Sequence, residues 1–320
     1  MTLEKTSTLK VSSLAKAYGN VHALADLNLD VTRGEVYGFL GRNGAGKSTT
    51  IRIIMGITQA TSGSVHLFGE KAEGRRHVAL RQRIGYVAQE QNFYGWMTPK
   101  TLGSFLRGFY PTWDDTAYAK LLQGLELPER RIRTFSGGMK VKLALAAALA
   151  YDPELLVLDE PTAGLDPVAR REFLEMVRDQ AERSSRTTFF STHLIDEIEL
   201  AAHRVGIVDN GRTRYEGTVR DLAARVRLLR CPAPNGVAVP LPERIRNAPQ
   251  RFEILQDRHH QGHQEVIVMA ADAADFGEWN PGASFVESLD GARQTTWNLA
   301  EMPLEEIFIE MVRRPLDTAL

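Results

Sequence analysis

The feature that most constrains this chain is a glycine-rich loop set between an apolar run and a helix-like run. The segment from Phe39 to Thr50 has the sequence F-L-G-R-N-G-A-G-K-S-T-T and matches the pattern G-x-x-x-x-G-K-[ST]. The apolar residues at 36–40 predict a buried strand, and residues 48–55 predict the helix that follows. Backbone N–H groups of such a loop and the helix dipole both attract phosphate oxygens. The sequence therefore predicts a phosphate-binding loop in an α/β fold.

Each side chain of this loop has an expected contact with a bound nucleoside triphosphate. Lys47 is expected to reach the β- and γ-phosphates, and Ser48 to offer its hydroxyl to Mg²⁺. Thr49 is expected to donate a hydrogen bond to an α-phosphate oxygen. The remaining residues of the loop are expected to present their backbone to the phosphates: Gly41, Asn43, Gly44, Ala45 and Gly46.

The composition is that of an ordinary globular chain, and it excludes recognition by net charge. The 320 residues are 43% hydrophobic and 25% charged, enough for one large or two modest domains. Lys and Arg number 39 against 40 Asp and Glu, so no overall positive field holds nucleic acid. The first ten residues have no apolar signal core, and the longest apolar run, Leu143 to Ala150, is too short to span a bilayer. A single cysteine, Cys231, suits a reducing compartment, and we expect a cytosolic chain with no nucleic-acid partner.

A second motif places two adjacent acids at the end of an apolar run. Leu155 to Asp166 has the sequence L-L-V-L-D-E-P-T-A-G-L-D. Open α/β sheets bind ligands at the carboxyl ends of their strands, so both acids are predicted to face the phosphate loop. Asp159 is expected to hold Mg²⁺, and Glu160 to polarise the water that attacks the γ-phosphate. The chain is thus predicted to hydrolyse its nucleotide.

Three further segments carry groups suited to phosphate. Ser136, Gly137 and Gly138 open a helix-like run, so their backbone is predicted to form a second anion site at a helix N-terminus. Gln89 follows a short apolar run and is expected to contact Mg²⁺ or the attacking water. His193 follows a β-rich run and is expected to hydrogen-bond the γ-phosphate. One chain thus holds two phosphate half-sites, which need not serve the same nucleotide.

These motifs, in this order, make the segment from about Leu9 to Gly217 resemble the nucleotide-binding subunit of the ATP-binding cassette (ABC) family. The resemblance implies that the nucleotide is ATP and that Tyr18 stacks on the adenine. It makes His193 the switch histidine and places Asp166 in the D-loop, where it can also cap the following helix. It further implies that two cassettes pair head to tail, with ATP between the phosphate loop of one and Ser136 of the other.

The signature segment (Ser136–Gly138) is flanked by two departures from the family pattern. Phe135 stands where leucine is usual, and Met139 where glutamine is usual. Because the serine and the glycine backbone bind the phosphate, we expect activity to survive both changes.

The expected fold class is a P-loop NTPase: an α/β, RecA-like core with an antiparallel β portion and a helical subdomain, plus a small C-terminal α+β domain. The nucleotide-binding domain is expected over residues 1–217, with its helical subdomain at about 90–154. The accessory domain is expected over 218–320, and it ends in the amphipathic run Met302 to Arg313. Such a stripe is covered either by its own domain or by a second copy of the chain. We expect this domain to hold two copies together or to regulate them.

Aromatic residues and Met gather at the start of the helical subdomain, and two interpretations remain open. They either form a groove for a helix of a membrane subunit, as in the family, or fill the subdomain core. The residues are Phe93, Tyr94, Trp96, Met97, Phe105, Phe109 and Tyr110.

Together these features predict the ATP-hydrolysing subunit of a bacterial ABC transporter of the drug- or peptide-exporter type. It is expected to be peripheral at the cytoplasmic face of the inner membrane. Its expected partners are a second copy or paired ABC ATPase and a transmembrane permease on a separate chain. The alternative is a soluble ABC ATPase acting on DNA or ribosomes, but such members carry two cassettes or long coiled-coil insertions. A phosphate-loop kinase would leave the signature segment and His193 without a role.

Overall fold

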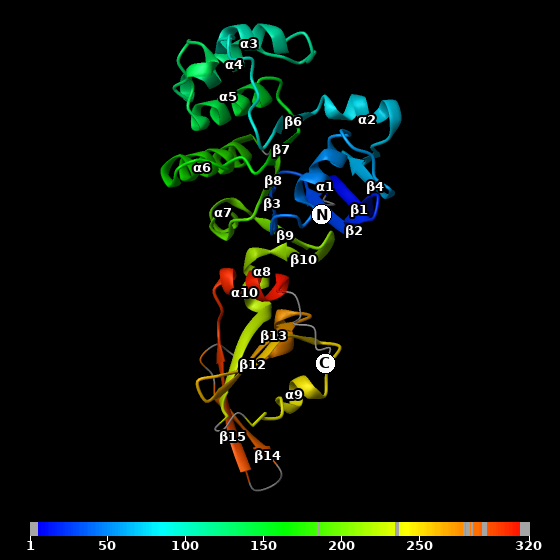
Figure 1. Ribbon diagram of the computed structural model, residues 1–320, viewed down its shortest axis with the longest axis vertical. Coiled ribbons are helices and arrows are strands. Elements are labelled where there is room, and N and C mark those ends of the chain that lie inside the picture. The colour runs from blue at the N-terminus through cyan, green and yellow to red at the C-terminus, as the bar shows by residue number, and fades with distance from the viewer. Residues whose placement is uncertain are drawn as a thin grey trace, which may run out of the picture. The chain divides into compact units, whose positions relative to one another are not determined.

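The computed structural model describes residues 6–184, 186–233, 237–277, 279, 282, 284–289 and 293–313. The chain divides into two compact units, Met1–Glu216 and Gly217–Leu320 (Figure 1). Within the described residues, the first unit contains a ten-stranded sheet and the second a five-stranded sheet. Each unit is considered below by itself.

Parallel strands form the centre of the first sheet. In spatial order they are β3 (Val36–Gly41), β8 (Thr187–Thr192), β7 (Leu155–Asp159) and β6 (Ile84–Val87). Every residue of β3, β7 and β8 is buried, as expected for parallel strands covered on both faces. The register sets Leu40 beside Thr192 and Asp159 beside Ser191. The loops that follow these strands therefore leave the sheet at the same edge.

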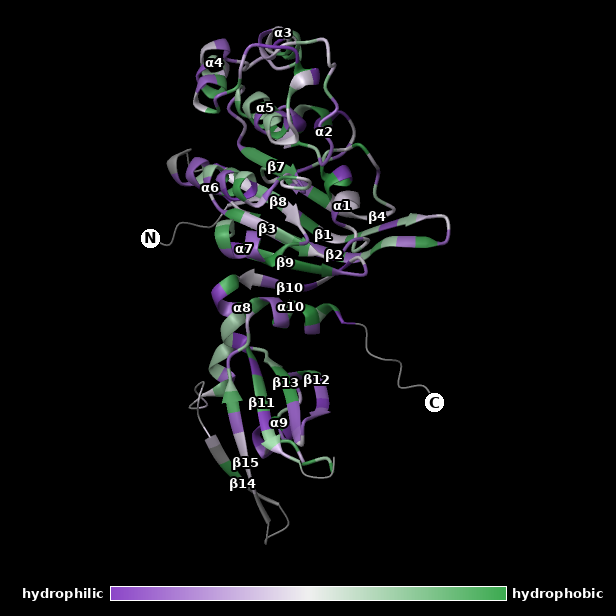
Figure 2. Ribbon diagram, turned by 60° about the vertical axis from the view of Figure 1, so that its left-hand side comes forward, coloured by the Kyte–Doolittle hydropathy of each residue, from purple (hydrophilic) through white to green (hydrophobic). Residues whose placement is uncertain are grey.

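Helices cover both sides of this centre (Figure 1). Helix α1 (Lys47–Ile54) contacts β3 and β7, and it buries Ile51 and Ile54. On the other side, α6 (Pro167–Ser184) and α7 (Ile195–Ala201) contact β8 and each other. The hydrophobic colour in Figure 2 follows β7 and β9 between these layers. The buried strands explain why the sequence shows apolar runs here rather than alternation.

Antiparallel strands extend the same sheet: β2 (Val21–Thr32), β1 (Ser7–Tyr18), β4 (Ser62–Leu67) and β5 (Glu70–Lys71). They join the parallel centre through β10 (Arg212–Thr218) and β9 (Arg204–Asp209), which lie between β2 and β3. One core unites both parts, since Leu9 and Leu27 pack in the same cluster as Ile51 and Val157. The predicted α/β fold with an antiparallel β portion is confirmed.

Between β6 and β7 the chain forms a helical subdomain. Its elements are α3 (Pro99–Leu106), α4 (Asp115–Gly124), the 3₁₀ turn η1 (Ile132–Thr134) and α5 (Gly137–Leu149). Thr98, Asp114 and Ser136 cap the three helices, each through a side-chain oxygen that accepts backbone N–H bonds. Phe135 is buried in the core of the subdomain, so the aromatic ring fills the place expected for leucine.

The aromatic set at the start of this subdomain divides between core and surface. Met97 is buried in the core, and Phe93 packs against it. Tyr110 stacks on Tyr151 with ring centroids 3.9 Å apart. The exposed members are Tyr94, Trp96, Phe105 and Phe109. The interpretation as core therefore holds for part of the set, and a groove for a membrane subunit stays a prediction.

The second unit is built on an antiparallel sheet in the order β12, β13, β11, β15, β14. The strands are β11 (Val226–Pro232), β12 (Phe252–His260), β13 (His263–Ala270), β14 (Ser284–Leu289) and β15 (Arg293–Ala300). The helices are α8 (Val219–Arg225), α9 (Glu243–Arg246), η3 (Ala273–Phe276) and α10 (Leu304–Val312). Trp297, Leu229 and Val268 lie in its core, and burial raises the pKa of the Cys231 thiol to about 11, which keeps it unreactive.

The C-terminal amphipathic run forms α10, and its apolar side chains are covered within the single chain. Ile307, Phe308 and Met311 are all buried without a second copy. Glu310 of the same helix pairs with Arg258 of β12, 3.6 Å away. The apolar stripe of α10 is therefore buried by its own chain, and no second copy is needed to cover it. In the part of the chain that the structure describes, no helix combines the length and apolar character needed to cross a membrane.

Candidate nucleotide site

The phosphate loop (Gly41–Ser48) leaves the end of β3 and enters α1, as its sequence predicts. Gly44 and Gly46 have φ angles of 84° and 109°, in the left-handed region that favours glycine. A Cβ atom added at Gly46 would lie 2.5 Å from the Leu24 side chain and 2.8 Å from the Ala23 carbonyl oxygen. The loop thus needs glycine there both for its backbone angle and for its close packing on β2.

A cavity of about 270 Å³ opens beside this loop. It is lined by Ala23, Asn43, Gly44, Gly46, Lys47, Ser48, Thr49, Gln89 and Glu160. Residues from the loop, from the end of β6 and from the end of β7 are thereby brought together, because those strands end at the same edge. Only Ala23 of this lining was missed by sequence reasoning, since a lone alanine in a strand carries no signal of a site.

Lys47 is almost fully buried and has three oxygen neighbours. Its ammonium donates to the carbonyl oxygens of Gly41, at 2.8 Å, and Arg42, at 3.3 Å. It also pairs with Glu160 Oε1 at 3.0 Å, and the two side chains are 4% and 11% exposed. Removing one member of a buried pair leaves an uncompensated charge, which costs about 3–5 kcal/mol. Lys47 and Glu160 therefore depend on each other in this arrangement.

Glu160 occupies a strained backbone position. Its φ is 42°, a left-handed value that costs a non-glycine residue about 1–3 kcal/mol. Neighbours along a strand point to opposite faces, and this turn at the end of β7 brings Glu160 to the same cavity that Asp159 approaches. Such strain persists only where surrounding contacts hold it, and it concentrates at functional positions.

Ser191, which sequence reasoning missed, holds both acids. Its hydroxyl donates to Asp159 Oδ1 at 2.8 Å and accepts the backbone N–H of Glu160 at 3.0 Å. The residue is fully buried at the end of β8, directly beside Asp159 in the sheet. A serine within an otherwise buried strand, two residues before His193, was the available signal.

Asp159 and Ser48, which the sequence predicts as Mg²⁺ ligands, bring their oxygen atoms close together. Ser48 Oγ lies 3.3 Å from Asp159 Oδ1. Burial raises the pKa of the Asp159 carboxyl above its ordinary value, and the charge of Glu160 adds to this, while hydrogen bonds from Ser191 and Ser48 oppose it. A desolvated carboxylate beside a hydroxyl at a phosphate cavity fits a hard cation that prefers oxygen.

His193 joins the same group from the end of β8. Its Nδ1 lies 3.2 Å from Glu160 Oε2, so the two carboxylate oxygens of Glu160 face Lys47 and His193 respectively. The imidazole is 41% exposed, whereas the carboxylate is nearly buried. His193 therefore lies where it can contact both Glu160 and a group entering from solvent.

The remaining predicted residues lie outside the lining of this cavity. Tyr18 ends β1 and is 48% exposed, and Lys16 Nζ lies 4.8 Å from its ring centroid. Ser136 begins α5, where its hydroxyl accepts the N–H of Met139 at 3.3 Å. A Cβ atom added at Gly137 would meet no heavy atom within 4 Å among the described residues. Asp166 caps α6, accepting the N–H groups of Val168 and Ala169 at 3.0 Å each.

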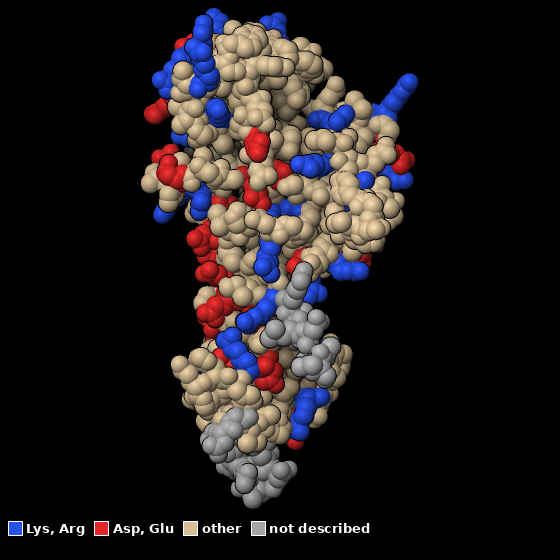
Figure 3. Space-filling model, in the orientation of Figure 1, with Lys and Arg blue, Asp and Glu red and all other residues tan. Residues whose placement is uncertain are grey.

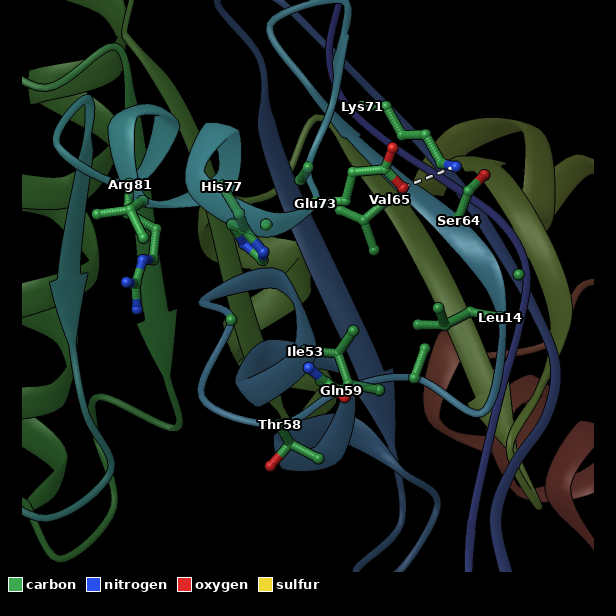
Figure 4. A pocket seen from close by; sticks show the side chains of 16 residues that line it. Leu14, Ile53, Thr58, Gln59, Ser64, Val65, Lys71, Glu73, His77 and Arg81 are labelled. Atoms are coloured by element: carbon green, nitrogen blue, oxygen red, sulfur yellow. Dashed lines mark ion pairs between the residues drawn. The ribbon is translucent and has the colours of Figure 1, made fainter.

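Another pocket, of about 400 Å³, lies between α1, β4 and α2 (Gly74–Arg81), and Figure 4 shows its lining. His77 and Arg81 of α2 hydrogen-bond the carbonyl oxygens of Ile54, at 2.7 Å, and Met55, at 3.0 Å. They thereby satisfy the C-terminal end of α1, whose N-terminal end carries the phosphate loop. We therefore assign the residues of this pocket a structural role, which is to stabilise α1. On the face seen in Figure 3, basic and acidic side chains are interspersed, in keeping with the net charge of −1.

Comparison with known proteins points in one direction. Residues 24–163 match the family model for the ABC transporter. The chain is 33% identical over 315 residues to the bacitracin transport ATP-binding protein BcrA of Bacillus licheniformis, covering 96% of this chain and 98% of that protein. It is 37% identical over 224 residues to the linearmycin resistance ATP-binding protein LnrL of Bacillus subtilis (strain 168), covering 68% and 71%. A dimeric ATP-binding cassette solved in a post-hydrolysis state with ADP and Pi matches with a TM-score of 0.60 and 25% identity, covering 66% of this chain and 99% of that one.

Because the charge of Asp159 is buried, we expect that removing it stabilises the fold although the residue serves the proposed site. Asp159→Asn keeps an oxygen that can accept from Ser191 and Ser48 but removes the charge. Because the pKa of Asp159 is raised in the folded state, its charge destabilises the fold above that pKa, and the cost falls as the pH drops through it. We expect the variant to gain on the order of 1 kcal/mol at pH 7, a gain that shrinks in acid. Thermal unfolding without nucleotide, followed from pH 7 into acid, measures this. A melting temperature of the variant below that of the wild type at pH 7 would contradict it.

Proposed function

We propose, for a chain that belongs to the ABC transporter family, that ATP is bound by the phosphate loop after β3 and hydrolysed with Glu160 as the base. The chain is an ATP-hydrolysing subunit of an exporter-type ABC transporter. The observation that carries the proposed roles is the meeting of Lys47, Glu160 and His193 beside the glycine loop. The proposed cation for phosphate and the proposed base both line this cavity, and the partner of that base contacts it from the end of β8.

In the proposed mechanism, the ammonium of Lys47 leaves Glu160 and contacts the phosphates instead. A γ-phosphate competes for the ammonium and so releases Glu160 Oε1, which then accepts a hydrogen bond from the attacking water. His193 keeps Oε2 oriented and contacts the γ-phosphate from its exposed side. Ser48, Asp159 and Gln89 are the residues that would hold Mg²⁺, and the ion would supply positive charge to neutralise the β- and γ-phosphates.

The signature segment is proposed to complete the site of a second copy. Ser136 and Gly137 stand at the exposed start of α5 and do not line the cavity of their own chain, within the residues described. The open space around Gly137 leaves room for a phosphate to approach the backbone N–H groups. Tyr18 offers an exposed ring for the adenine. A head-to-tail dimer, of this chain or with a paired ATPase, follows from this arrangement.

We further propose a permease on a separate chain, which would hold this subunit at the cytoplasmic face of the membrane. A groove of about 300 Å³ between β6 and the helical subdomain supports this, and its aromatic lining includes Phe93, Tyr110 and Tyr151. An apolar groove with aromatic walls suits a helix laid across it. The membrane subunit then selects the exported compound.

The role of Glu160 is tested by removing its charge. Glu160→Gln should bind ATP with affinity near that of the wild type, yet its turnover should fall by about 10²–10⁴-fold, because the base is lost. As the contrasting variant, Lys47→Ala should lose ATP affinity. Fluorescent nucleotide titration and steady-state phosphate release measure the two effects. Near-normal turnover in Glu160→Gln would move the base elsewhere.

The shared site is tested by mixing two inactive chains. Lys47→Ala disables the phosphate loop and Ser136→Arg disables the signature segment. A mixed dimer contains one site with both lesions and one with neither, so part of the hydrolysis should return on mixing. Phosphate release from each chain alone and from mixtures gives the answer. If subunits demonstrably exchange and no activity returns, each site is complete in one chain.

The proposed accessory role of residues 218–320 is tested by truncation after Gly217. Tyr18, Lys47 and Asp159 all remain, so ATP affinity should stay within about threefold of the full chain while dimerisation weakens. Nucleotide titration and analytical ultracentrifugation measure these properties. A folded truncated chain that binds no ATP would contradict this separation of roles, and one that dimerises normally would reduce the second unit to a folding aid.

A further inference from the structure

A buried carboxylate outside the cavity contacts the loop that carries Glu160. Glu197 lies on α7 and is 1% exposed. Its Oε1 accepts a hydrogen bond from the hydroxyl of Thr162, which is itself 3% exposed. Arg170, in the first turns of α6, places its Nε 3.6 Å from the same oxygen. Glu197 thereby touches the chain both before and after the D-loop turn (163–166).

Two side-chain contacts therefore connect residues 193–197 with residues 160–162. His193 contacts Glu160, and four residues later Glu197 contacts Thr162, two residues after Glu160. The first link is partly exposed and faces the cavity, whereas the second is sealed from water. A buried hydrogen bond to a charged group is strong and costly to leave unmade, so the second link fixes the spacing that the first one uses.

The strain at Glu160 explains why such a link is needed. A left-handed backbone at a glutamate persists only when neighbouring contacts determine it. Ser191 holds the N–H of Glu160 on one side, and Thr162 is anchored on the other. Without the anchor at Thr162, the turn after Glu160 is free to relax toward an ordinary backbone conformation and to carry the carboxylate away from its position.

We propose that Glu197 is a positioning residue for ATP hydrolysis, which holds Glu160 and the D-loop turn in place through Thr162. The inference rests on the proposed function of Glu160 as base. It also extends to the signature segment, because Leu165 of the same turn lies beside Gly138, where an added Cβ atom would be 3.7 Å away. Among the described residues, the hydrogen bond and the ion pair of Glu197 go to Thr162 and Arg170 and not to the phosphate loop, so its effect is expected on turnover and not on ATP binding.

Matched variants of the full chain test this role. Glu197→Leu removes the acceptor, whereas Glu197→Gln keeps an oxygen for the Thr162 hydroxyl. We expect kcat to fall roughly 10- to 100-fold in Glu197→Leu with the ATP Kd within about twofold, and to recover most of the wild-type value in Glu197→Gln. Glu265→Leu is the control, because Glu265 is an equally buried, ion-paired carboxylate of the second unit. It should lower the melting temperature and leave kcat unchanged.

A second pair of variants keeps the test sound if Glu197→Leu fails to fold. Thr162→Val should lower kcat as Glu197→Leu does, and Thr162→Ser should retain it. The double variant Thr162→Val/Glu197→Leu should be no slower than either single variant, since both remove one contact. The proposal would be overturned if the losses of kcat in the two single variants multiplied in the double variant. It would also be overturned by an unchanged kcat in Thr162→Val, or by equal losses in Glu197→Gln and Glu197→Leu. Glu160→Gln, assayed alongside, shows separately whether the assignment of the base holds.

Discussion

The buried pair between Lys47 and Glu160 is the interaction on which the rest of the site depends. It joins the loop after β3 to the turn after β7, with β8 between those strands in the sheet. A lysine and a glutamate this far from water are stable only as a pair. In the proposed mechanism a phosphate replaces Glu160 beside the ammonium, and Glu160 keeps its contact with His193. The pair would then tie the arrangement of the proposed base to the presence of the nucleotide.

The parallel register supplies the precision that this pair requires. Strand ends set side by side place Asp159 beside Ser191 and Leu40 beside Thr192, so functional groups from distant parts of the chain need only short loops to meet. The helices that cover both faces keep these strands dry and rigid. A buried polar group near the start of a strand has a partner as well: the Tyr37 hydroxyl of β3 donates to Glu216 Oε1 at 3.0 Å, since an unpaired polar group would be costly there.

The sequence predicts those residues of the site that belong to a local sequence pattern. Glycine spacing and adjacent acids after an apolar run are local patterns, so the fold class and the motifs around Lys47 and Asp159 could be predicted. Ser191 and Glu197 act through contacts between segments, and no local pattern distinguishes them from other polar residues. Exposure is equally hidden, so the sequence did not tell that Met97 is buried and Trp96 exposed. The functional roles of the site residues stay predictions.

The position of the signature segment completes the physical argument for a second chain. Ser136 caps α5, which satisfies one backbone N–H at the start of that helix, but a helix has four such groups without internal partners. At Gly137 the backbone faces open space, and the phosphate cavity of the same chain is lined by other residues. A helix N-terminus that is glycine-rich and exposed offers N–H groups suited to an anion. In the proposed dimer these groups would bind a phosphate held by another copy, and hydrolysis would then depend on association.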